Sequence, residues 1–162
     1  MALTPPADLV LTPLKGDGRS LEDWLTTFHL ASVVLDPYTV ESAWVLDTAA
    51  RILRAFAGAD VRVNFVVTAT AEDASAFLGP LAEEFLVFTD PDRAVVKAFG
   101  LNALPAFVLV GEDGTVQAAA EGWSAMSWRA VAETIATMTA WTKPAIPIAS
   151  DPAAFAGSPA FG

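Results

Sequence analysis

The chain has 162 residues, of which 54% are apolar and only 17% are charged. This balance excludes an intrinsically disordered chain, and the length fits one domain better than two. Nine Lys and Arg against nineteen Asp and Glu leave a net charge of −10, which argues against the basic face that nucleic acids and anionic membranes attract. We therefore expect neither nucleic acid nor a membrane as a partner.

Two residue types that carry much of enzyme chemistry are scarce in this sequence. There is no cysteine, and His29 is the only histidine. Disulfides, thiolate catalysis and sulfur-ligated metals are therefore excluded. The acidic residues do not follow the spacing of a calcium loop, and the glycines form no phosphate-binding motif. The sequence predicts no metal and no cofactor.

Neither a targeting segment nor a membrane segment is visible. The first six residues contain no basic stretch followed by an apolar core, as a secretory signal would. The longest charge-free stretch before the carboxyl-terminal region, residues 98–111, is interrupted by Gly100 and Pro105, whereas a spanning helix needs about 20 apolar residues. We expect a cytoplasmic protein.

The predicted elements begin with a hairpin-like extension. The sequence predicts a strand, a glycine turn and a short helix opened by a capping box, at residues 8–12, 15–18 and 20–25. His29–Leu35 is an apolar, β-branched run typical of a strand buried on both faces. Asp36-Pro37 follows, with Asp36 as the predicted N-cap of a helix that extends to about residue 58.

The second half alternates strands with helices and then closes with a hairpin. The pattern predicts strands at residues 61–67, 86–88, 106–110 and 115–120. It predicts helices at residues 70–85, 92–99 and from Ser124 or Ser127 to Trp141. An Asp-Gly turn joins the last two strands. This order indicates a three-layer α/β domain with a mixed sheet of four or five strands and helices on both faces.

Beyond Thr142 the composition changes. Prolines and glycines recur, while Ile146, Ile148, Phe155 and Phe161 remain apolar. We therefore expect a domain over residues 1–142 and an irregular Pro-, Gly- and Ala-rich tail over 143–162, without regular structure. Two alternatives stay open for the tail. It lies on its own chain with a few docked side chains, or it docks on a partner subunit.

The order of elements and two strings resemble the thioredoxin fold in its redoxin branch. That branch holds the alkyl hydroperoxide reductase/thiol-specific antioxidant (AhpC/TSA) proteins, the peroxiredoxins and the thioredoxin-like reductases. The strings are LVLTPLKGDGRSLEDWL, which is similar to the family's amino-terminal hairpin, and FTDPDRAVVKAFGLNALPAFVLVGEDGTVQAAAEGW, which is similar to its carboxyl-terminal half. The resemblance covers roughly residues 8–141 and implies a thioredoxin-like sandwich.

The resemblance places the family's active site at Thr39-Val40-Glu41-Ser42. Thioredoxin-like reductases carry Cys-x-x-Cys there and peroxiredoxins carry Thr-x-x-Cys, so Thr39 and Ser42 occupy the positions of the functional residues. Thiol–disulfide exchange and peroxide reduction both need a thiolate. A hydroxyl cannot replace it, and we therefore predict that the site is degenerate and holds no catalytic residue. The strand entry at Ala103-Leu104 also lacks the arginine that peroxiredoxins use.

A peptide-binding groove is the part of the family's site that this sequence retains. Pro105 matches the family's cis-proline, whose neighbours pair with extended peptide substrates. The resemblance implies that the loop carrying Trp123 lies beside it, and that Tyr38 takes the place of a tryptophan that often precedes the active-site motif. The predicted groove is therefore lined by Tyr38, Thr39, Ser42, Leu104, Pro105 and Trp123.

Two classes of function remain open. The first is a redox-inactive module that binds a peptide, another protein or a second copy of itself, as a homodimer. The alternative is a redoxin-type enzyme that works with an exogenous thiol such as glutathione, or one that uses Asp36, Thr39 and Ser42 in unrelated chemistry. A serine nucleophile needs an adjacent base, and His29 lies at the far end of the predicted strand.

Overall fold

The computed structural model describes residues 3–161. Its strands are β1 (Val10–Pro13), β2 (Arg19–Ser20), β3 (His29–Leu35), β4 (Val61–Val67), β5 (Leu86–Thr89), β6 (Ala103–Leu104), β7 (Ala106–Val110), β8 (Val116–Glu121) and β9 (Ser158–Pro159). Its helices are α1 (Leu21–Trp24), α2 (Val40–Ala55), α3 (Ala71–Leu78), α4 (Leu81–Glu84), α5 (Ala94–Ala98) and α6 (Ala125–Thr139).

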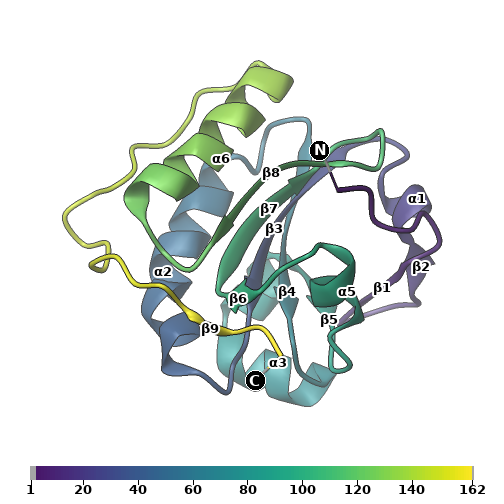
Figure 1. The fold of residues 1–162 in the computed structure, drawn as a ribbon. Helices are drawn as coiled ribbons and strands as arrows, with labels where there is room; N and C mark the ends of the chain where they lie inside the picture. The colour runs from purple at the N-terminus through teal and green to yellow at the C-terminus, as the bar shows by residue number, and fades with distance from the viewer. Residues whose placement is uncertain (1–2, 162) are drawn as a thin grey trace.

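A seven-stranded mixed sheet runs through the middle of the molecule in the order β2-β1-β5-β4-β3-β7-β8 (Figure 1). β3 pairs in parallel with β4, and β4 pairs in parallel with β5. β7 and β8 close the opposite side as an antiparallel hairpin. The amino-terminal hairpin adds β1 and β2 to the edge of β5, so it extends the predicted five-strand sheet. The mixed α/β architecture expected from the sequence is confirmed.

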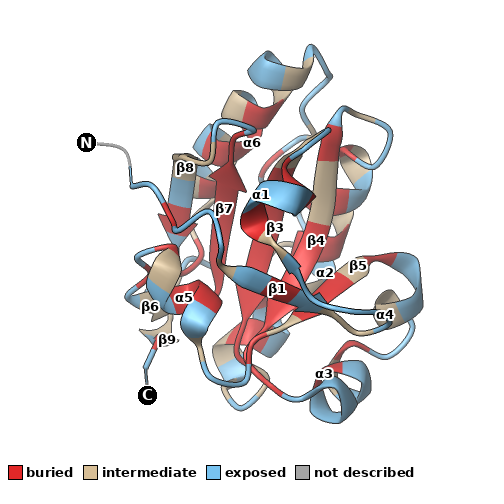
Figure 2. Cartoon of the chain, turned by 90° about the vertical axis from the view of Figure 1, so that its right-hand side faces the viewer, coloured by how far each residue is buried: buried red, intermediate tan, exposed pale blue. Residues whose placement is uncertain are grey.

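Helices cover both faces of the sheet because the buried strands are apolar on both sides (Figure 2). In β3, Val33 and Leu35 face α2 and α6, whereas Leu30 and Val34 face α1 and α5. This alternation is the two-residue period of a strand buried between two layers. Within residues 3–161, none of the helices has the length and apolar character that crossing a membrane requires.

The helices predicted over residues 70–85 and 92–99 differ from those of the structure. The predicted helix over residues 70–85 is divided into α3 and α4, because Gly79 has a positive φ of 56°, which is incompatible with a continuing α-helix, and Pro80 has no N–H for the hydrogen-bond ladder. The predicted helix over residues 92–99 begins only at Ala94. Arg93 is left-handed, with φ of 59°, and the Asp90 carboxylate accepts hydrogen bonds from the first-turn amide of Val95.

We expect the free energy of unfolding to contain a contribution from Asp90 that decreases as the pH rises. Burial raises the pKa of its carboxyl above the ordinary 3.8, and the amides of Val95 and Val96 offset only part of that effect. The folded protein therefore retains this proton to a higher pH than the unfolded chain does. The contribution is complete below the ordinary pKa and is lost as the pH rises through the folded-state pKa.

Urea unfolding at a series of pH values from acidic to neutral checks this expectation. Asp90→Asn should gain stability relative to the wild type as the pH rises, because the amide cannot ionise. Asp113→Asn is the matched control of opposite sign, since hydrogen bonds from Thr115 lower the pKa of the Asp113 carboxyl. Stability from Asp113 is present above its unfolded pKa and lost at lower pH. Equal pH profiles for the two variants would contradict the assignment.

The tail crosses the molecule on its own chain and ends near β6 (Figure 1). Ser158 and Pro159 form β9, which pairs antiparallel with Leu104 and Ala103 of β6. The prediction of a tail without regular structure is therefore wrong at this point. A proline is tolerated because β9 is a two-residue edge strand, where its missing N–H interrupts no ladder.

Candidate functional site

Thr39 and Ser42, which the resemblance assigns to the family's active-site positions, lie where β3 ends and α2 begins, and both of their hydroxyls are bonded to the backbone. Thr39 is the N-cap residue of α2, and its Oγ1 donates to the Asp36 carbonyl at 3.0 Å. Ser42 is fully buried, and its Oγ accepts from the Asp36 amide at 2.9 Å. His29 lies at the other end of β3, where its Nδ1 accepts from the amide of Glu112. No imidazole is therefore near Ser42 to act as a base.

Asp36 does not cap α2 as the sequence suggested. Its Oδ1 accepts from the Tyr38 amide at 3.0 Å, which closes the turn before the helix. Its Oδ2 forms an ion pair with Arg93 Nη2 at 2.9 Å, and the Asp36 side chain is only 6% exposed. The capping position falls to Thr39 because the turn through Pro37 and Tyr38 delays the helix by three residues.

Arg93 is the site residue that the sequence did not predict. The strand entry at Ala103-Leu104 has no basic residue. The loop that follows β5 instead brings a guanidinium, that of Arg93, to the Asp36 carboxylate. Parallel pairing of β3, β4 and β5 brings their carboxyl ends to the same edge of the sheet, so the Asp-Pro-Asp-Arg string that ends at Arg93 meets Asp36. That string directly follows a predicted strand, and this was the available signal.

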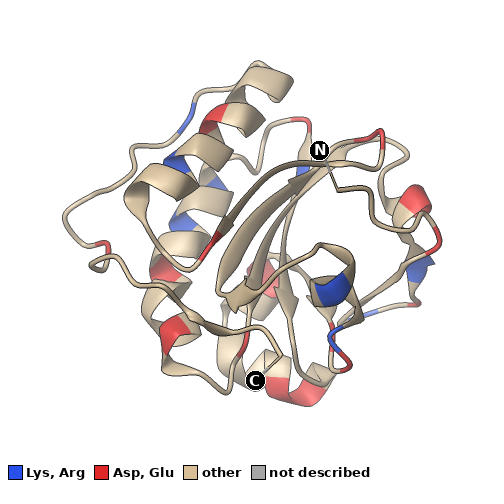
Figure 3. Cartoon of the chain, viewed as in Figure 1, with Lys and Arg blue, Asp and Glu red and all other residues tan. Residues whose placement is uncertain are grey.

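Tyr38 lies on the open side of the site. Its ring is largely exposed, and its hydroxyl donates to Asp73 Oδ2 on α3 at 2.6 Å. The hydrogen bond to this carboxylate raises the pKa of the Tyr38 phenol. Figure 3 shows acidic positions on α3 and on the first part of α2, so this end of the molecule is acidic.

The cis-proline loop lies beside the loop that follows β8. The Leu104–Pro105 peptide is cis, as the resemblance leads us to expect, and the Pro105 carbonyl accepts from the Gly122 amide at 2.7 Å. Both Leu104 and Pro105 are buried. Trp123 follows Gly122 and is only 2% exposed. We call this area, formed by residues 102–105 and 122–123, the β6 surface.

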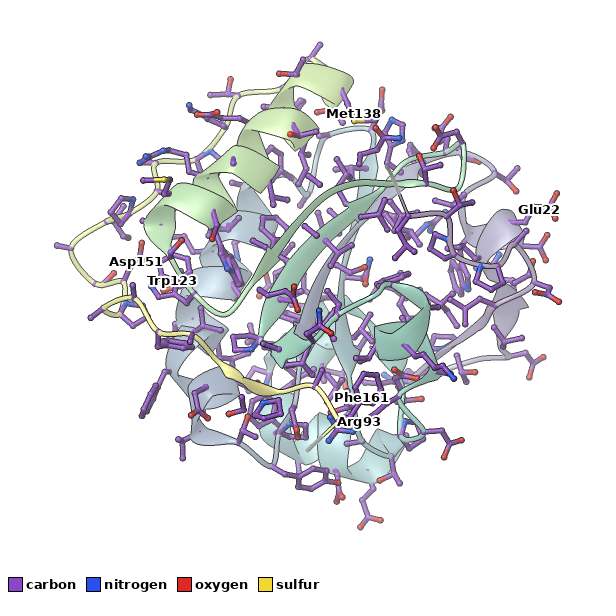
Figure 4. All side chains as sticks on the ribbon, in the orientation of Figure 1. Glu22, Arg93, Trp123, Met138, Asp151 and Phe161 are labelled. Carbon is purple, nitrogen blue, oxygen red and sulfur yellow. The ribbon has the colours of Figure 1, made fainter. Side chains whose placement is uncertain are left out.

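The tail covers the β6 surface. Trp123 packs edge-to-face on Trp128 at 5.1 Å, and its Nε1 donates to the Pro152 carbonyl at 2.8 Å. Figure 4 shows Trp123 next to Asp151 of the tail, and Arg93 next to Phe161 near the carboxyl terminus. The structure therefore brings Leu104, Pro105 and Trp123 together beneath the tail. Tyr38 instead contacts α3 and Thr39 begins α2.

The described part of the chain offers no metal centre. Within residues 3–161, no group of three or more His, Asp or Glu side chains is arranged to hold a metal ion. Asp36 is already paired with Arg93. The polar groups at this site are backbone amides and carbonyls, the Asp36–Arg93 ion pair, the Tyr38 phenol and the two hydroxyls of Thr39 and Ser42.

Several solved structures share this fold. A putative thioredoxin from Neisseria meningitidis is 22% identical with a TM-score of 0.67, over 85% of this chain and 90% of its own. A putative thiol:disulfide interchange protein DsbE from Chlorobium tepidum is 20% identical with a TM-score of 0.68, over 84% and 95%. The bacterioferritin comigratory protein of Xanthomonas campestris, described for its alkyl peroxide reduction activity, is 18% identical with a TM-score of 0.64, over 87% and 97%. These likenesses show a thioredoxin-like fold.

The sequence itself carries the family relationship. No curated protein sequence matches the chain. The sequence profile of the Redoxin family matches residues 48–135, which is more than half of the chain and includes β4 to β8 and most of α6. The matched part begins after Ser42, so the two hydroxyl residues of the degenerate site lie outside it. The chain belongs to the Redoxin family and has no cysteine with which to carry out thiol chemistry.

Proposed function

We propose that this redoxin binds an extended protein segment at the β6 surface and has no catalytic activity of its own. One observation carries the proposal: an extended strand, the tail, already lies on this surface. Phe155 and Trp123 exchange two backbone hydrogen bonds, at 2.9 and 2.8 Å, and the Ala160 amide donates to the Asn102 carbonyl at 2.9 Å. The surface therefore has the hydrogen-bonding groups that an added strand requires.

Adding a strand to an exposed edge is a general mode of peptide recognition. The backbone hydrogen bonds contribute affinity, and side-chain contacts on alternate residues contribute specificity. β6 has only two residues, so its ladder is short, and the loop at Trp123 continues the pairing beyond it. A partner segment of about six residues would span both parts, as the tail does.

The state of the polar groups supports a binding role over catalysis. Ser42 Oγ is buried and accepts a backbone hydrogen bond, Thr39 Oγ1 donates to a carbonyl, and the Asp36 carboxylate is paired with Arg93. A nucleophile needs an adjacent base, and a general base needs a free carboxylate or imidazole near the substrate. None of these three side chains meets that condition.

We expect the purified full-length protein to reduce no insulin disulfides and to consume no hydroperoxide beyond the reductant blank, with or without glutathione. Both reactions require a thiol that the sequence does not contain. Turnover that persists in the wild type and disappears in Ser42→Ala would overturn the non-catalytic part of the proposal.

Binding is tested separately with an array of synthetic decapeptides and the labelled full-length chain. Peptides that bind should shift the amide resonances of Ala103, Leu104 and Trp123 in the isotopically labelled protein. Binding that shifts only resonances on another surface would contradict the proposed site.

A further inference from the structure

We infer that residues 155–160, here called the strap, are a resident ligand of the β6 surface. The external segment then has the chemistry of the strap: an aromatic residue, glycine two positions later, and a small residue at the last position. It binds only after the strap has left. This inference rests on the proposed function. It adds the chemistry of the ligand and the segment that regulates its binding.

Glycine at the third strap position is required by a close approach of two backbones. Gly157 has φ of +88°, and a Cβ at this residue would lie 2.7 Å from the Leu104 carbonyl oxygen. On the opposite side, Gly122 has φ of +71°, and a Cβ there would lie 2.5 Å from the Ala156 carbonyl oxygen. Both obstacles are backbone atoms that cannot rotate away. A segment with a side chain at this position therefore does not fit.

The two ends of the strap occupy different subsites. Phe155 packs edge-to-face on Trp44 of α2, with 5.5 Å between the ring centroids. Ala160 is fully buried in the apolar layer that contains α5. Its carbonyl accepts a hydrogen bond from Arg93 Nη1, while Nη2 of the same guanidinium holds Asp36. The aromatic subsite selects one end of a ligand, and the space around Ala160 admits only a small residue at the other.

The segment before the strap is anchored independently of it. The Asp151 side chain is only 2% exposed and accepts hydrogen bonds from Thr48, Arg51 and the Ile148 amide, at 2.8 to 2.9 Å. Residues 153–154, between this anchor and the strap, are exposed. The strap can therefore leave the β6 surface while Asp151 remains bound.

The anchor also explains why an external ligand would compete poorly with the strap. A short tether gives a linked segment an effective concentration of about millimolar. A free peptide of the same sequence at micromolar concentration binds only molecules whose strap is open. Its apparent Kd therefore equals the intrinsic Kd divided by the open fraction. The wild-type protein should therefore bind such a peptide weakly.

The experiment opens the surface with one change in the tail and leaves residues 1–156 as they are. Gly157→Val in the full-length chain places a Cβ against Leu104 and should displace the strap. Ala156→Val is the matched control, because Ala156 is exposed and receives the same side chain. The probe is a fluorescein-labelled peptide of residues 153–161, followed by fluorescence anisotropy. We expect Gly157→Val to bind it about tenfold more tightly or better than the wild type, and Ala156→Val to match the wild type.

Hydrogen exchange at the amides of Phe155 and Ala160 shows whether the strap has left the β6 surface in Gly157→Val. This measurement separates a failure of the control by the strap from a failure of the proposed function. Equal peptide binding by wild type and Gly157→Val would overturn the control by the strap and leave the proposed function standing. A displaced strap without peptide binding would overturn the proposed function itself. Two results would overturn the requirement for glycine. The first is a strap whose amides stay protected from exchange in Gly157→Val. The second is a probe peptide with valine in place of Gly157 that binds as tightly as the unchanged probe peptide.

Discussion

Replacing Trp123 with alanine should lower the free energy of unfolding by about 3–5 kcal/mol. The indole is 2% exposed, packs on Trp128 and donates a hydrogen bond to the Pro152 carbonyl. Its loss leaves a cavity between α6 and the tail, and it also leaves that carbonyl without its donor. Urea unfolding followed by circular dichroism measures the change, and limited proteolysis should show faster cleavage in the tail.

Trp44→Ala is the matched control for this variant. Trp44 is 57% exposed and contacts Phe155 through the edge of a ring, so its removal should cost about 1 kcal/mol. If Trp123 instead lined an open surface, as the sequence suggested, the two substitutions would have similar small effects. Similar effects would therefore contradict the position of the tail.

Arg93→Met should lower the free energy of unfolding by about 3 kcal/mol, because it leaves the nearly buried Asp36 carboxylate without a cation. It also removes the donor to the Ala160 carbonyl. A double-mutant cycle with Asp36→Asn separates the two effects. The amide retains the oxygen that accepts from Tyr38, so the double variant should recover part of the loss, whereas the part due to Ala160 should remain.

A second arginine–carboxylate pair provides the control. Arg54 forms two hydrogen bonds with Glu84, but both side chains are substantially exposed, at 53% and 40%. Arg54→Met should therefore cost less than about 1 kcal/mol. Equal losses for Arg54→Met and Arg93→Met, or strict additivity in the Asp36 cycle, would show that the Arg93–Asp36 pair is not the buried contact described above.

The strands could be predicted from the sequence because their signal is local. β3, β4 and β7 have the predicted bounds, since each is a largely apolar or β-branched run. The helices were predicted less well. Periodicity over residues 70–85 continues through Gly79 and Pro80, and only the backbone conformation of these two residues ends α3.

The surroundings of the predicted site could be predicted only in part. Thr39 and Ser42 lie at the start of α2, just after β3, because the sequence pattern already gives a strand followed by a helix there. Arg93 contacts Asp36 across 57 residues of sequence, and no periodic pattern records a contact of that length. It depends on the parallel pairing of three strands.

By itself, the sequence determined that this redoxin lacks the sulfur needed for thiol chemistry, and that its core strands are buried on both faces. The first conclusion follows from the absence of cysteine, and the second from continuous apolar and β-branched runs. Neither depends on distant contacts. Only the tertiary structure decided that the tail covers the β6 surface and buries Trp123. The composition of the tail is compatible with either open alternative, and its position follows from complementary shape and backbone hydrogen bonds between segments far apart in the chain.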